Sequence, residues 1–118
     1  MKSVSWRFAF RKLNEWREKQ SPITFGPVGD VEAQDETITI FSGSSGTRVE
    51  SADESTGVVK LFGEPEIDLS GATFKFGDFE GSPFNEADLG PEEFASQLEA
   101  RLPDGRILVF AEEWKVSR

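Results

Sequence analysis

The chain has 118 residues and a formal net charge of −9 at neutral pH, from 22 acidic and 13 basic residues. It contains no cysteine, histidine or tyrosine, which excludes disulfides, zinc sites built on Cys or His, and Ser-His-Asp or Cys-His catalysis. The remaining acid–base chemistry is that of carboxylates, lysine and arginine, so we expect no enzymatic activity and no cofactor.

The length predicts a single domain spanning residues 1–118. Eleven phenylalanines and three tryptophans supply enough apolar area for a core. No apolar run is long enough to cross a bilayer, and the first ten residues, MKSVSWRFAF, lack the apolar segment and cleavage site of a secretory signal. These features predict a cytoplasmic protein that does not associate with membranes.

The charge is unevenly distributed along the chain. Residues 1–20 contain six basic and two acidic residues, whereas residues 21–118 contain seven basic and twenty acidic residues. This pattern predicts a strongly acidic body with a basic N-terminal segment. Such a body repels nucleic acids and anionic membranes and attracts basic partners.

The N-terminal segment fits two patterns. Residues 3–10 largely alternate between polar and apolar, as in a half-buried strand. Read as a helix, the same segment and its continuation place five apolar side chains on one stripe, namely Trp6, Ala9, Phe10, Leu13 and Trp16. This single stripe favours a helix over residues 6–19 with Ser3 or Ser5 as N-cap. A strand over residues 3–10 followed by a short helix is the alternative.

The middle of the chain has the pattern of an antiparallel meander. Two prolines and two glycines in QSPITFGPVGD, residues 20–30, predict the end of the helix. Strand-like segments then recur about every ten residues. They are ETITIF (36–41), TRVES (47–51), GVVKLFG (57–63) and GATFKFG (71–77), and SGSSGT (42–47) predicts a hairpin loop between the first two.

A second helix is predicted between Pro91 and Pro103. Pro91 and the acidic residues Glu92 and Glu93 suit the first turn of a helix, and later apolar residues follow at helical spacing. The apolar run over residues 107–111 then predicts a strand that is central in the sheet. The expected fold class is α+β: an antiparallel or mixed sheet of about five strands, with an N-terminal helix and a helix in the C-terminal half packed on one face.

The stretch FKFGDFEGSPFNEADLG, residues 74–90, is the candidate binding region. Its acidic spacing resembles a calcium loop, but Pro83 and Leu89 stand where an EF-hand needs Gly and Glu, so we expect no metal site. A solvated loop that buries its aromatic side chains is one interpretation. The other is a surface that binds a basic protein through aromatic anchors and carboxylates. Its predicted contact residues are Asp78, Phe79, Glu80, Phe84 and Glu86.

Charge, size and the missing catalytic residue types favour an interaction protein. We expect a small acidic domain that binds a basic protein partner, in the manner of an inhibitor or immunity protein, without contacting nucleic acid directly. One alternative is a carboxylate-based small-ligand binder or enzyme, for which Glu112 and Glu113, on opposite faces of the last strand, are candidates. Another is an accessory subunit of a larger assembly.

Overall fold

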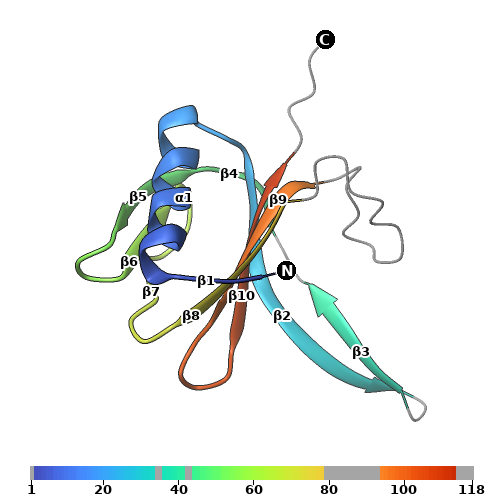
Figure 1. Ribbon diagram of the computed structural model, residues 1–118. Helices are drawn as coiled ribbons and strands as arrows, with labels where there is room; N and C mark the ends of the chain where they lie inside the picture. The colour runs from blue at the N-terminus through green and yellow to red at the C-terminus, as the bar shows by residue number, and fades with distance from the viewer. Residues whose placement is uncertain (1, 34–35, 42–43, 79–93, 114–118) are drawn as a thin grey trace.

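The computed structural model describes residues 2–33, 36–41, 44–78 and 94–113 (Figure 1). Over these residues the chain forms one helix, α1 (Trp6–Lys19), and short to medium-length strands. The strands are β1 (Lys2–Val4), β2 (Ile23–Ala33), β3 (Glu36–Phe41), β4 (Ser44–Thr47), β5 (Val49–Asp53), β6 (Val58–Leu61), β7 (Ile67–Asp68), β8 (Thr73–Asp78), β9 (Phe94–Arg101) and β10 (Ile107–Glu113).

The strands form two antiparallel sheets. The larger sheet has the order β1-β8-β9-β10-β2-β3, and β4 also pairs with β2. The smaller sheet has the order β5-β6-β7. One helix with antiparallel sheets agrees with the predicted α+β class, but the expectation of about five strands and two helices is wrong. β10 lies between β9 and β2, so its predicted central position is confirmed.

The predicted helix over residues 6–19 is confirmed. The Ser5 side chain caps it by accepting a hydrogen bond from the Phe8 backbone N–H at 3.0 Å. The helix ends at Gln20, whose left-handed backbone lets the N–H groups of Gln20 and Ser21 bond back to the last turn. The apolar stripe points into the core, with Ala9, Phe10, Leu13 and Trp16 buried and Trp6 packed partly against them.

Two lysines of α1 pair with an acidic residue of the same helix. Lys19 and Lys12 donate to the Glu15 carboxylate at 3.1 and 3.3 Å. The hydrogen bond from Lys19 is the main reason that the pKa of Glu15 lies below its usual value, and the same contact raises the pKa of Lys19. These exposed pairs contribute little to stability. They are local, one helical turn apart, but Lys12 Nζ also lies 5.2 Å from the centre of the Phe76 ring on β8, within reach of a cation–π contact.

Two side chains join α1 to the smaller sheet. Trp6 Nε1 donates to the backbone carbonyl of Glu54 at 2.9 Å. Asn14 Nδ2 donates to the carbonyls of Phe10 and Ala52 at 2.9 and 3.0 Å. One amide group therefore donates a hydrogen bond to a carbonyl of the helix and another to a carbonyl of β5. These bonds set the position of the helix along the β5–β6 hairpin.

The core lies where α1 meets both sheets. The helix contributes its apolar stripe, the smaller sheet contributes buried residues such as Val59 and Leu61, and the larger sheet contributes Phe74, Leu98 and Phe110. Edge-to-face contacts join the helix to β8, with Phe10 and Phe74 ring centroids 6.1 Å apart. Because the smaller sheet alone is only three short strands, its stability depends on this shared core.

Residues 94–101 form strand β9, so the predicted second helix is wrong over these residues; residues 91–93 lie outside the described residues. β9 pairs along its length with β8 and β10. Phe94, Leu98 and Leu102 fit helical spacing, but Ser96, Leu98 and Ala100 also alternate, and all three of these are buried. Pairing with strands on both sides decided between two patterns that the local sequence left open.

The predicted end of the helix at residues 20–30 is confirmed, and the segment after it is a strand. Gly26, Pro27 and Gly29 lie within the eleven-residue strand β2, which pairs with β10 and then with β3. Residues 44–47, predicted as part of a hairpin loop, form β4 against β2. Local glycine and proline content indicates a break, but neighbouring strands supply enough pairing to extend the backbone through it.

Candidate functional site

The predicted contact residues lie mostly outside the described residues. Asp78 is the last residue of β8, with its backbone opposite Ser96 of β9. Phe79, Glu80, Phe84 and Glu86 follow it in the segment that the structure does not describe. Their role in binding therefore stays a prediction.

One open groove on the described surface has an apolar floor and an acidic rim. It has a volume of about 330 Å³ and lies between the segment around β7 and one end of the larger sheet. We call it the acidic groove. It is lined by Phe25, Glu64, Pro65, Glu66, Ile67, Asp68, Leu102, Arg106 and Leu108.

The floor of the acidic groove continues the core. Phe25 and Leu108 are half-buried and pack against the core cluster, and the Phe25 ring lies 4.8 Å from that of Phe110. Ile67 closes the floor from the smaller sheet. Because these side chains are only partly covered, a ligand that entered the groove would remove more apolar surface from water.

The rim of the acidic groove carries uncompensated negative charge. Asp68 accepts hydrogen bonds from the backbone N–H and hydroxyl of Ser70 at 2.9 and 2.6 Å, which lower its pKa below the usual value for aspartate. Within the described part of the chain, no basic side chain lies within 4.0 Å of Glu64, Glu66 or Asp68. Arg106 bonds instead to Asp104, at 2.7 Å.

The β2–β3 hairpin extends from the same end of the larger sheet. Val28 lies opposite Ile107, the first residue of β10, and β2 continues for five further residues with only β3 beside it. At a strand rise of about 3.3 Å per residue, this extension is roughly 17 Å long, and it projects from the body in Figure 1. In the sequence, residues 30–36 include Asp30, Glu32, Asp35 and Glu36 and no basic residue.

Negative charge is therefore concentrated in particular segments. Ten of the 22 carboxylates lie in residues 30–36 and 78–93, which contain no basic residue. The rest of the chain holds twelve acidic and thirteen basic residues. Within the acidic body predicted from residues 21–118, these two segments hold half of the twenty carboxylates.

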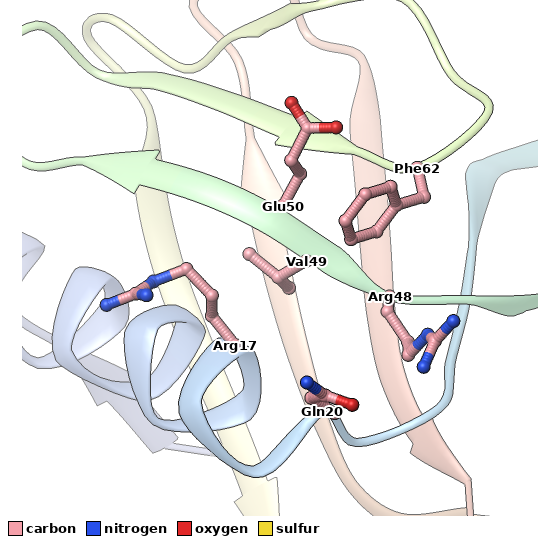
Figure 2. A pocket seen from close by; sticks show the side chains of 6 residues that line it. All are labelled: Arg17, Gln20, Arg48, Val49, Glu50 and Phe62. Atoms are coloured by element: carbon pink, nitrogen blue, oxygen red, sulfur yellow. The ribbon is translucent and has the colours of Figure 1, made fainter.

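The second groove has the opposite character, and we call it the arginine groove. It has a volume of about 320 Å³ and lies between the last turn of α1 and the start of β5 (Figure 2). Its lining residues are Arg17, Gln20, Arg48, Val49, Glu50 and Phe62. Phe62 is 53% exposed. Among the described residues it is the one large apolar side chain that is exposed rather than buried or half-buried.

Backbone bonds hold the arginine groove in shape. The Phe62 N–H donates to the Arg48 carbonyl at 3.0 Å, and the Thr47 hydroxyl donates to the Phe62 carbonyl at 2.7 Å. The Arg48 guanidinium lies 5.9 Å from the centre of the Phe62 ring, within reach of a cation–π contact. On the helix side, Arg17 Nε donates to Asn14 Oδ1 at 3.1 Å.

Glu112 and Glu113 contact different partners, as expected for neighbours on one strand. Glu112 accepts from the Ser96 hydroxyl at 3.0 Å. Glu113 accepts from the Thr24 hydroxyl at 2.9 Å and from the Gly46 N–H at 3.0 Å. These bonds tie β10 to β9, β2 and β4, which gives both carboxylates a structural role.

Sequence reasoning missed both grooves. The acidic groove was signalled by Glu64-Pro65-Glu66-Ile67-Asp68, where carboxylates alternate with apolar residues. The arginine groove had no local signal, because Arg17 and Arg48 are 31 positions apart in the chain. Only the docking of α1 on β5 brings them to the same groove.

No cluster of three or more metal-ligating side chains occurs within the described residues. The helix α1 is not long and apolar enough to span a membrane, and no other helix is found in the described residues. The chain matches no protein-family model, no curated protein and no solved structure.

Proposed function

We propose that this protein is an interaction protein that binds a basic segment of a partner protein, with the acidic groove as its binding site. The observation that carries this proposal is the combination of a half-buried apolar floor with three carboxylates that form no ion pair in the described structure, while Arg106, the one basic residue among those that line the groove, pairs with Asp104. Apolar floors supply binding energy, and surrounding charges supply partner selection and association rate. A lysine- or arginine-bearing segment with apolar side chains matches both features.

The β2–β3 hairpin extends from the same end of the larger sheet as the acidic groove. It starts beside the acidic groove, and the sequence of residues 30–36 holds four acidic residues. β3 is an edge strand, paired with β2 alone among the described strands, so its free backbone groups can accept an added strand from the partner. Asp78, Phe79, Glu80, Phe84 and Glu86 remain proposed contacts from the second acidic segment. Inhibition of a basic target, as by an immunity protein, is the form of binding that we favour.

The proposal is tested by affinity capture of partners from a cell extract with tagged protein. The wild type is compared with a Glu64→Gln/Glu66→Gln variant and with a Phe79→Ala/Glu80→Gln variant. The matched control is Glu18→Gln/Glu54→Gln, which removes two carboxylates from exposed positions outside the groove. We expect a stoichiometric basic protein that high salt releases, that the groove variant loses and that the control retains.

Binding that the groove variant retains in full would remove the acidic groove from the proposal. Loss only in the Phe79→Ala/Glu80→Gln variant would transfer the site to residues 78–86. If the wild type captures no basic protein at low salt, the interaction function itself is wrong. Direct titration of the identified partner, with its affinity measured at several salt concentrations, then gives the electrostatic share of the binding.

A further inference from the structure

The arginine groove places positive charge and exposed aromatic surface together on a chain whose net charge is −9. Within the described residues no carboxylate lies within 4.0 Å of the Arg48 guanidinium, and the nearest to Arg17 is Glu18, at 4.0 Å. Glu50 lies at the rim, but Lys60 bonds to it at 3.5 Å. The two guanidinium groups therefore retain donors for a ligand.

The arrangement of the groove excludes a single small anion as its best ligand. Figure 2 shows Arg17 and Arg48 at opposite ends of the groove, with Val49 and Phe62 between them. Their guanidinium groups point away from each other, so one carboxylate or phosphate cannot reach both. A ligand that uses the whole groove must be extended, with a negative group near each end and apolar surface in the middle.

We propose that the arginine groove binds an extended acidic segment of a partner protein, with carboxylates at Arg17 and Arg48 on either side of an apolar or aromatic residue that packs on Phe62. This inference does not depend on the acidic groove, because the two surfaces differ in position and in the sign of their charge. Arginine suits such a site because its planar guanidinium forms paired hydrogen bonds with a carboxylate. An exposed aromatic side chain beside it supplies the anchor.

The groove is prepared for this ligand before binding. Asn14 holds the Arg17 side chain and is itself held by two backbone carbonyls, from α1 and β5. Two hydrogen bonds, from the Thr47 hydroxyl to the Phe62 carbonyl and from the Phe62 N–H to the Arg48 carbonyl, hold the backbone at the other end. Because these groups are already ordered, less conformational entropy is lost when the segment binds.

The test uses the full chain and fluorescein-labelled peptides, followed by fluorescence polarisation up to about 1 mM protein. The acidic probe is Gly-Glu-Asp-Phe-Asp-Glu-Gly. Its comparison peptides are the uncharged Gly-Gln-Asn-Phe-Asn-Gln-Gly and an acidic peptide with Gly in place of Phe. Since the chain as a whole repels acidic peptides, tighter binding of the acidic probe than of the uncharged one requires a local positive site.

Variants then locate the site. We expect Arg48→Gln and Arg17→Gln each to weaken binding of the acidic probe roughly tenfold, and Phe62→Ser to remove the preference for Phe over Gly in the peptide. Arg7→Gln is the matched control, because Arg7 is an exposed residue of the same helix about 15 Å away along its axis. It should bind the probe as the wild type does. Circular dichroism and thermal melting verify that each variant is folded.

Three results overturn the proposal. The first is equal affinity for the acidic and uncharged peptides, a comparison on wild-type protein that needs no variant. The second is a loss of affinity for the acidic probe in Arg7→Gln as large as that in Arg48→Gln. The probe would then respond to the overall charge of the protein and not to the arginine groove. The third is self-association of the chain, in sedimentation analysis, that Arg48→Gln abolishes, because the occupant would then be a second copy of this protein.

Discussion

The indole Nε1–H of Trp6 donates to the backbone carbonyl of Glu54, 48 residues further along the chain, at 2.9 Å. This bond joins the first turn of α1 to the turn between β5 and β6. The same ring packs on Phe10, with centroids 4.7 Å apart, and on Phe74 at 5.7 Å. Trp6 therefore links the helix, the smaller sheet and the larger sheet at one point.

Trp6→Phe tests the contribution of this hydrogen bond. Phenylalanine keeps most of the aromatic packing but leaves the Glu54 carbonyl without its donor. We expect a loss of about 1–2 kcal/mol in the free energy of unfolding, measured by urea denaturation. A change smaller than about 0.5 kcal/mol would mean that water replaces the indole without cost.

Gly57→Ala tests how closely Trp6 approaches the β5–β6 turn. Gly57 has φ +82°, and a Cβ built on it would lie 2.9 Å from Trp6 Cη2 and 3.2 Å from the Ser70 nitrogen. Gly63 has almost the same φ, +83°, with no atom within 4 Å of its Cβ position. Gly63→Ala should cost about 1 kcal/mol through the backbone alone, and Gly57→Ala about 2–4 kcal/mol.

The double variant Trp6→Phe/Gly57→Ala separates the steric cause from the backbone cause. Phenylalanine lacks the Cη2 atom that the new methyl group would contact. We therefore expect Gly57→Ala to cost less in the Trp6→Phe background than in the wild type. The free energies of unfolding of the wild type, the two single variants and the double variant are measured by the same urea denaturation. If the losses of the two single variants add up to that of the double variant, the predicted contact between the two residues is wrong.

Ser5→Ala tests the N-cap of α1. The substitution removes the acceptor for the Phe8 N–H and should lower the free energy of unfolding by about 1 kcal/mol. Ser21→Ala is a matched comparison beyond the other end of the helix. The Ser21 hydroxyl is buried without a hydrogen-bond partner among the described residues, so its removal should be neutral or stabilising. Thermal melting of both variants gives the contrast, and equal losses would contradict it.

Asp53→Asn tests the pH dependence of the β5–β6 turn. Asp53 Oδ1 accepts from the hydroxyl and backbone N–H of Ser55, at 2.6 and 2.9 Å, and these bonds lower its pKa below 3.8. Because the folded pKa is lowered, the contribution to stability is present above pH 3.8 and is lost as the pH falls through the lower, folded value.

Asp53→Asn should therefore reduce the pH dependence of unfolding between about pH 5 and pH 2. Glu54→Gln, at the exposed neighbouring position, serves as the control. Urea denaturation across this range measures the effect. The prediction is contradicted if the free energy of unfolding changes with pH as steeply in Asp53→Asn as in the control. The ionised Asp53 carboxylate would then stabilise the turn no more than the amide does.

Local sequence determined the elements whose signals lie within the element itself. The stripe from Trp6 to Trp16 and a serine cap favour α1 over the alternative strand without reference to the rest of the chain, because helical bonds form between residues four apart. The apolar run at 107–111 likewise predicted a central strand. The absence of cysteine and histidine limits the available chemistry through composition alone, whatever the fold.

Tertiary structure decided what depends on distant residues. Phe94–Arg101 is a strand because β8 and β10 pair with both of its edges, and Ile23–Ala33 crosses Pro27 because three strands pair along it. The arginine groove and the acidic groove each combine residues far apart in the chain. Strand pairing and groove formation depend on contacts between residues far apart in the chain. A short stretch of sequence therefore does not predict them.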